Sequence, residues 1–211
     1  MTSAGGLRSQ SPNLQATTAD KHLDADFRLS GEIESTWTQK LTLTDGRGIN
    51  VRPIESGDLK LLVEFHERLS PTSIYNRLFC AYPHLNLVEA KVFVGVDYDR
   101  RMAFVAPDVG LLVGVGGYEG LDDQRSAEVA FVVADDYQEN GLASVLLRLL
   151  ARYANLCGYS RLVAQKLISN HIMREVFVAF GYSTRFRDQD GVTDVELDIG
   201  TESTLIEGQG P

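Results

Sequence analysis

A glycine-containing turn with the features of a phosphate-binding loop follows the apolar segment EVAFVV at residues 128–133. The turn reads QENGLA over residues 138–143 and leads into a stretch with helical periodicity. The first N–H groups of a helix lack internal partners and the helix dipole adds partial positive charge there, so backbone donors alone can hold a phosphate. Gly141 lets a ligand approach the backbone closely. A tight strand-to-helix turn without a ligand is the alternative interpretation of this hexapeptide.

The charge balance restricts the classes of partner. The chain of 211 residues contains 20 Lys and Arg against 29 Asp and Glu, so its formal net charge is −9. Nucleic acids and anionic membranes are bound by basic surfaces, and the composition therefore argues against both partners. No segment approaches the run of about 18 apolar residues that a membrane-spanning helix needs, and the N-terminus lacks the apolar core of an export signal. We expect a cytoplasmic protein.

The remaining motifs argue against a disulfide framework, a metal site and a P-loop. The two cysteines, Cys80 and Cys157, cannot build a disulfide framework, and neither they nor the histidines have zinc-ligand spacing. We therefore expect no metal. No GxxxxGK[ST] sequence occurs, which argues against a P-loop nucleotide site. The glycine-rich segment LLVGVGGYEG at residues 111–120 precedes another strand and predicts a strand that must stay slim beside a neighbour or ligand.

The elements that would position the turn follow from periodicity. Residues 1–35 are polar and aperiodic and predict a mobile arm, residues 36–200 one folded domain, and residues 201–211 a tail. A hairpin is expected around Asp45-Gly46. We then predict helices over 57–69, 71–79 and 87–93 and strands over 101–106, 111–119 and 127–133. A helix from Leu142 that Gly158 ends, a strand over 161–167, a helix capped by Asn170 or Ser169, and a hairpin around Asp190-Gly191 complete the chain.

The order of these elements predicts an α+β domain. Most of the predicted strands are joined by hairpins, which pair strands antiparallel. The segment from Val133 to Leu167 is instead a strand, helix and strand, and predicts a single βαβ crossover with a parallel pair. The sheet should therefore be mixed and mostly antiparallel, with helices on its faces.

Several segments resemble the GNAT superfamily of N-acetyltransferases. Gln138-x-x-Gly141-x-Ala143 is similar to the [RQ]-x-x-G-x-[GA] acyl-CoA pyrophosphate motif, and SNHIMREVFVAFGY from Ser169 resembles a second superfamily segment. VRPIESGD, LSPTSIYNRLF, VDYDRRMAFVA and AEVAFVVADDYQENGLA look like the acetyltransferase domain of bacterial Pat-type protein lysine acetyltransferases. The resemblance covers residues 36–200 and implies a GNAT-type acyl-CoA N-acyltransferase fold.

The resemblance also implies site residues. Glu128, at the start of its strand, corresponds to the catalytic glutamate of Pat-type enzymes. The pantetheine arm of acetyl-CoA is expected along the end of the same strand, its pyrophosphate on the turn, and a further contact on the following helix. The implied acyl-CoA contacts are Phe131, Val132, Val133, Gln138, Glu139, Asn140, Gly141, Leu142, Ala143, Ser144 and Asn170.

The implied reaction has a clear need for a carboxylate. A lysine amine has an ordinary pKa of about 10.4, so at neutral pH it is protonated and cannot attack a thioester. A glutamate can remove that proton, directly or through water. The predicted function is direct acetyl transfer from acetyl-CoA to protein lysine side chains in a ternary complex. A small-molecule amine acceptor and a catalytically weak CoA-binding regulatory module stay open as alternatives, as does the oligomeric state.

Two departures from the family pattern bear on activity. Phe177 stands where many GNAT enzymes have a tyrosine general acid, so another donor or solvent must protonate the leaving thiolate. Glu139 and Asn140 replace the usual glycine and arginine of the turn. The loss of a cation and the gain of an anion should weaken CoA binding unless other residues compensate.

Overall fold

The computed structural model describes residues 33, 35–78, 85 and 87–200. The predicted tail and nearly all of the predicted N-terminal arm therefore lie outside the described residues, as do Cys80 and the predicted end of the second helix at Phe79. The chain divides into two units, Met1–Thr36 and Trp37–Pro211. Everything below concerns the second unit.

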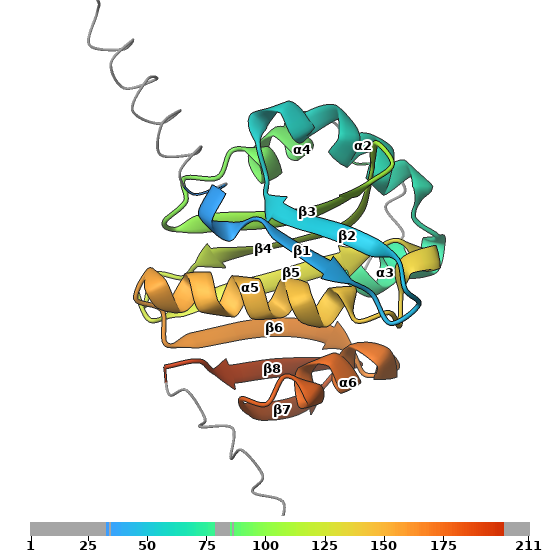
Figure 1. Ribbon diagram of the computed structural model, residues 1–211. Coiled ribbons are helices and arrows are strands. Elements are labelled where there is room, and N and C mark those ends of the chain that lie inside the picture. Colours follow the sequence, from blue (N-terminus) through green and yellow to red (C-terminus); the bar gives the residue numbers. More distant parts are fainter. Residues whose placement is uncertain (1–32, 34, 79–84, 86, 201–211) are drawn as a thin grey trace, which may run out of the picture. The chain divides into compact units, whose positions relative to one another are not determined.

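The strands of this unit form one sheet in the order β1-β2-β3-β4-β5-β6-β8-β7 (Figure 1). They are β1 (Gln39–Thr42), β2 (Gly48–Pro53), β3 (Arg101–Asp108), β4 (Leu111–Gly120), β5 (Ser126–Val133), β6 (Arg161–Leu167), β7 (Ser183–Gln189) and β8 (Val192–Asp198). The β5–β6 pair is parallel and the other pairs are antiparallel. The mixed, mostly antiparallel sheet predicted from the sequence is confirmed.

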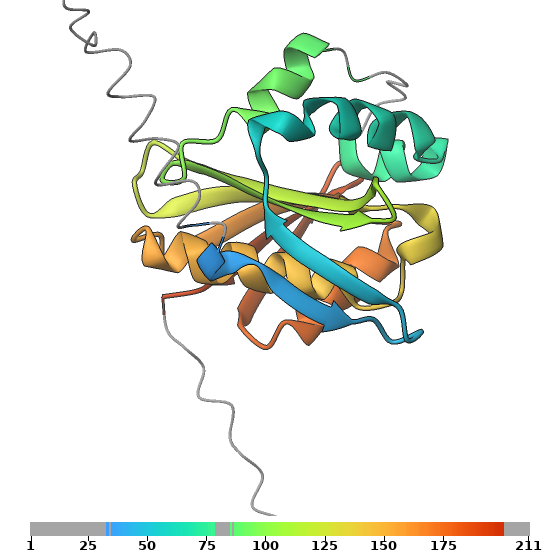
Figure 2. The ribbon, with the colours of Figure 1, turned by 45° about the horizontal axis from the view of Figure 1, so that its top comes forward.

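Helices cover both faces of the central strands. The α-helices are α2 (Leu59–Arg68), α3 (Pro71–Leu78), α4 (Leu87–Val94), α5 (Leu142–Leu156) and α6 (His171–Ala179), with 3₁₀ turns η1 (Ser56–Asp58) and η2 (Asp135–Tyr137). Figure 2 shows α2 and α4 on one side of β3 and β4, and α5 on the other. The first predicted helix begins as the 3₁₀ turn η1, and there the Asp58 carboxylate accepts hydrogen bonds from the Glu55 N–H and from Arg52.

The glycines of β4 let α5 pack closely on the sheet. A Cβ atom at Gly116 would lie 3.0 Å from the Phe131 Cβ and 3.2 Å from a Leu150 methyl. At Gly114 it would lie 3.0 Å from a Leu142 methyl. Since real Cβ atoms rarely pack this tightly, larger residues would push the helix away. This confirms the prediction that the glycine-rich strand stays slim beside a neighbour.

The parallel pair opens a gap in the sheet. β5 and β6 are paired only where Ser126–Glu128 lies opposite Arg161–Val163. No backbone pairing joins the rest of these two described strands. Both strands continue, to Val133 and Leu167. The diverging half of β5 therefore has unpaired backbone groups beside α6 and the turn before α5.

None of the helices in the described part of the chain is long and apolar enough to cross a membrane.

Candidate active site

The turn before α5 presents backbone donors that have no backbone partner among the described residues. Gly141 is the N-cap residue of α5 and has a left-handed backbone conformation, with φ of 85°. A glycine has no side chain that could accept a capping hydrogen bond from the first N–H groups of the helix. The first helical hydrogen bond runs from the Val145 N–H to the Gly141 carbonyl at 3.1 Å. The N–H groups of Leu142, Ala143 and Ser144 precede it and make no intrahelical bond. They form a site suited to an anion.

A groove of ≈460 Å³ lies over this turn, between the end of β5 and α6. The predicted acyl-CoA contacts Phe131, Val132, Val133, Gln138, Glu139, Gly141, Ala143, Ser144 and Asn170 all line it. The structure therefore brings together residues from β5, the turn and the start of α6. Asn170 also caps α6, since its Oδ1 accepts from the Met173 N–H at 3.0 Å.

Two predicted contacts have their side chains elsewhere. Leu142 is buried in the core at 1% exposure, against the slim strand β4. The Asn140 side chain accepts a hydrogen bond from Thr44 at 3.1 Å and donates to the Gln138 carbonyl at 3.0 Å. Leu142 and Asn140 thus help to hold the turn in place, and neither residue lines the groove.

Hydrogen bonds from η2 and from the start of α3 hold the turn in place. The Gln138 Nε2 donates to the Ser73 Oγ at 2.9 Å and to the Val133 carbonyl at 3.1 Å. Asp135 accepts from the Ser70 N–H and Oγ, at 3.0 and 2.6 Å, and from the Ser73 Oγ at 2.9 Å. These bonds outweigh the burial that raises the pKa of Asp135 and hold it below the ordinary value of 3.8.

A second support comes from the β1–β2 turn and was missed in the sequence. Besides Thr44, Arg47 donates to the Asp136 carbonyl at 2.7 Å, and its guanidinium lies 3.8 Å from the centre of the Tyr137 ring. Thr44, Ser73 and Asn76 also line the groove. Nothing local marks these residues, because their contacts reach 65 to 96 positions along the chain.

Glu128 lies where the groove approaches a second cavity. This cavity of ≈320 Å³ lies between the sheet and the helices α2 and α4, and Glu128, Ala130 and Val132 line it from β5. Val132 lines the first groove as well. A small pocket in the gap between β5 and β6 also contains Glu128, together with Phe131. The single strand β5 thus places Glu128 in the cavity and the predicted acyl-CoA contacts Phe131–Val133 along the groove.

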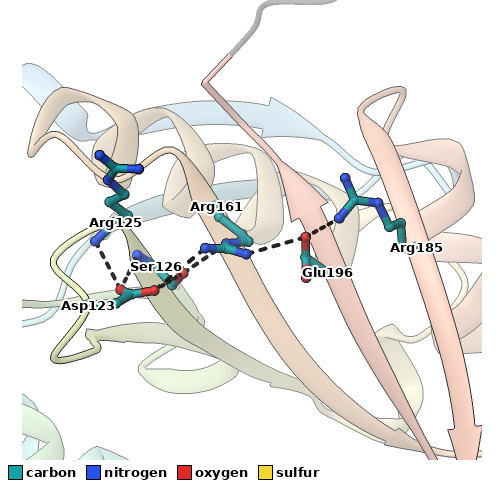
Figure 3. Close-up of polar contacts among 6 residues, drawn as sticks. All are labelled: Asp123, Arg125, Ser126, Arg161, Arg185 and Glu196. Carbon is teal, nitrogen blue, oxygen red and sulfur yellow. Dashed lines mark hydrogen bonds and ion pairs between the residues drawn. The ribbon is translucent and has the colours of Figure 1, made fainter.

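An ion-pair network fixes the start of β5 (Figure 3). The Arg161 guanidinium on β6 lies 3.6 Å from both Asp123 and Glu196, and its Nε donates to the Ser126 Oγ at 2.9 Å. Asp123 also accepts from the Ser126 N–H at 2.8 Å, while Arg185 on β7 lies 2.5 Å from Glu196. Because Ser126 is two residues before Glu128, the network sets the position at which that carboxylate emerges.

The position of the absent tyrosine is apolar. Phe177 is 2% exposed and packs edge-on against Phe131, with ring centroids 6.0 Å apart. Its ring forms part of the wall of the small pocket beside Glu128. Phe177 therefore lies beside Glu128, but its side chain has no acidic proton to donate to a leaving thiolate.

Cys157 lies far from the turn. It follows the C-terminal end of α5, whose 15 residues span about 22 Å. Burial raises the pKa of its thiol, so the nucleophilic thiolate is scarce at neutral pH. Within the described ranges, no group of three or more His, Cys, Asp and Glu side chains is placed to bind a metal ion.

Comparisons with known proteins agree with this arrangement. The model of the acetyltransferase (GNAT) family matches residues 64–182. An acetyltransferase of Pseudomonas aeruginosa is 32% identical over 158 residues, which are 73% of this chain and 84% of that protein. The acetyltransferase Pat of Mycolicibacterium smegmatis is 28% identical over 163 residues, which are 76% of this chain but only 48% of Pat, so the chain spans about half of that relative.

A solved structure gives the same result in three dimensions. The GNAT domain of PAT from S. lividans superimposes with a TM-score of 0.72 at 33% identity, covering 78% of this chain and 98% of that domain. The chain thus belongs to the GNAT family of acetyltransferases and has the GNAT fold.

Proposed function

We propose that this acetyltransferase moves the acetyl group of acetyl-CoA onto lysine side chains of proteins, with Glu128 as the general base. The observation that carries the proposal is the double role of β5. Its end lines the groove that leads to the free N–H groups of α5, and its start places Glu128 in a separate cavity. A donor and an acceptor can therefore approach the same strand from two sides.

The groove suits the donor. The N–H groups at the start of α5 would hold the pyrophosphate, and the pantetheine arm would lie along Phe131–Val133, where the β5 backbone is not paired with β6. Unpaired N–H groups on this part of the strand are candidates to polarise the thioester carbonyl. The similarity to the GNAT domain of PAT supports this placement.

The cavity suits the acceptor. Once the amine is bound, Glu128 takes one of its protons, directly or through water. The nitrogen lone pair then forms a bond to the thioester carbonyl carbon, the nitrogen releases its second proton to solvent, and the carbon–sulfur bond breaks with its electron pair leaving on sulfur. The thiolate is protonated by solvent or by the Glu128 carboxyl, because Phe177 cannot serve. The distance and raised pKa of Cys157 support direct transfer over an acyl-cysteine step.

The test combines binding with turnover in the full chain. Acetyl-CoA affinity is measured by calorimetry, and transfer is measured to a lysine peptide and to a small polyamine. Glu128→Gln keeps the size of the side chain and removes the base. We expect it to lower kcat/KM for the peptide by about 100-fold or more and to leave acetyl-CoA affinity within about two-fold. Glu67→Gln, on the exposed side of α2, is the matched control.

The outcomes separate the alternatives. Absence of acetyl-CoA binding would overturn the proposal. Binding without transfer to any amine would indicate a regulatory CoA-binding module. Transfer to the polyamine but not to the peptide would change the acceptor class, while full activity of Glu128→Gln would remove Glu128 from the mechanism.

A further inference from the structure

A second carboxylate lies beside Glu128 on the neighbouring strand β4, on the same face of the sheet. In the antiparallel β4–β5 ladder, Glu119 is directly opposite Glu128. Directly opposed residues point to the same face, with Cβ atoms about 4.5–5.5 Å apart. Both side chains are exposed, and both line the cavity between the sheet and helices α2 and α4. Two negative charges thus lie side by side at the edge of the proposed acceptor cavity.

Neighbouring carboxylates are neutralised by arginines, but these two have no such partner in the described part of the chain. Asp122 pairs with Arg100 at 2.7 Å, and Glu196 pairs with Arg185 at 2.5 Å. No ion pair within 4 Å joins Glu119 or Glu128 to a described basic side chain. Like charges placed opposite each other destabilise a sheet, so this pair is a cost to folding.

Several basic residues lie near the pair. Lys166 shares the small pocket beside Glu128, and Arg185 and Arg187 line another pocket with Glu128, over β6, β8 and β7. Arg101 is opposite Glu119 on the other side of β4 and lines the same cavity, but it pairs with Asp97 at 3.6 Å. Arg100 attracts Glu119 at longer range while its guanidinium bonds Asp122 and the Gly120 carbonyl. Arg100, Arg101 and Arg185 each pair with another carboxylate, and no described basic side chain forms an ion pair with Glu119 or Glu128, so the two glutamates keep a negative mouth to the cavity.

Most of the remaining cavity wall is apolar, although His66, Arg101 and Tyr118 also line it. Its walls include Ile54, Leu62, Phe65, Leu69 and Val132, of which Ile54, Leu62, Phe65 and Leu69 belong to the core. An apolar channel that ends at two carboxylates matches a cation carried on a hydrocarbon chain, because the chain gains from burial and the charge from pairing. A lysine side chain has both parts.

We propose that Glu119 is a specificity-determining residue that binds the protonated lysine of the acceptor together with Glu128. This inference rests on the proposed function and extends it. The ammonium group enters between the two carboxylates and relieves their repulsion. Glu128 then accepts one proton from the nitrogen, and Glu119 remains beside the amine. Glu119 selects the charged acceptor and Glu128 activates it.

The experiment compares Glu119→Gln with Glu67→Gln in steady-state acetylation of a lysine peptide by the full chain. For Glu119→Gln we expect KM for the peptide to rise about ten-fold, the scale of a hydrogen bond to a charged group, with kcat and its pH profile retained. Thermal stability should stay the same or rise, because the repulsion is removed. Glu67→Gln should match the wild type in all these properties.

A binding measurement tests the role of Glu119 in recognising the lysine without relying on turnover. Nα-acetyl-lysine amide and its uncharged analogue Nα-acetyl-norleucine amide are titrated into the CoA-bound protein. The wild type should prefer the lysine compound, and Glu119→Gln should lose most of that preference.

The inference fails if wild-type enzyme acetylates the peptide and Glu119→Gln leaves both KM and this preference unchanged. A fall in stability that accounts for the loss of activity would also refute it, since Glu119 would then be structural. If the wild type acetylates no lysine at all, the failure is that of the proposed function.

Discussion

Glu139 allows the sharpest test of how the turn binds its ligand. The residue has a φ of 60° although it is not glycine, and it lines the groove. Its left-handed backbone costs about 1–2 kcal/mol, and its negative charge lies in the turn proposed to hold a pyrophosphate. Two substitutions separate these effects, because Glu139→Gln removes only the charge whereas Glu139→Gly removes both the charge and the backbone strain.

The expected size of the charge effect follows from Coulomb's law. At about 8 Å from each of two phosphate charges, the repulsion in water is about 1 kcal/mol in total. Screening leaves most of it at about 0.01 M salt and about 0.4 kcal/mol at about 0.15 M. Both variants should therefore bind acetyl-CoA about four-fold more tightly than the wild type at low salt and about two-fold more tightly at physiological salt.

The free energy of unfolding should distinguish Glu139→Gly from Glu139→Gln. Glycine relieves the strain but gains freedom in the unfolded chain worth about 0.4–1 kcal/mol, so Glu139→Gly should raise the free energy of unfolding by roughly 0.5 kcal/mol. Glu139→Gln should leave it unchanged.

Calorimetry at the two salt concentrations and urea denaturation measure both quantities. The placement of the pyrophosphate is refuted if neither variant changes acetyl-CoA affinity at low salt. Tighter binding by Glu139→Gly alone would show that backbone freedom matters and charge does not.

Two further substitutions test the surroundings of the site. Asp135→Ala removes the acceptor of the bonds from Ser70 and Ser73, so the free energy of unfolding should fall by about 1–2 kcal/mol and acetyl-CoA affinity should drop. Because folding lowers the pKa of Asp135, the difference from wild type should be complete above pH 3.8 and shrink as pH falls below it, as urea titrations at several pH values would reveal. Burial and nearby Arg174 lower the pKa of Lys166, which is 2% exposed. Lys166→Met should stabilise the protein near neutral pH, and thermal melts should show this advantage shrinking as pH rises towards 10.5, where the unfolded wild-type lysine also loses its proton.

The sequence determined the elements whose signals are local. The hairpin turns at Asp45-Gly46 and Asp190-Gly191, the Asn170 cap and the strand, turn and helix around Gly141 all lie where their patterns indicate. Turn residues and caps act through hydrogen bonds and backbone angles within a few positions, so they can be read from short segments. The resemblance of those segments to the GNAT family then indicated Glu128, at the start of the strand that leads into the turn, as a site residue.

Only the tertiary structure decided what surrounds those residues. That Thr44 bonds Asn140 and that Ser73 bonds Gln138 depends on contacts between distant segments. The pairing of Glu119 with Glu128 depends on the register of β4 and β5, and a shift of one residue would turn one carboxylate to the opposite face. Register and packing are fixed by the whole core at once, so the charge at the acceptor cavity could be recognised only after the sheet was assembled.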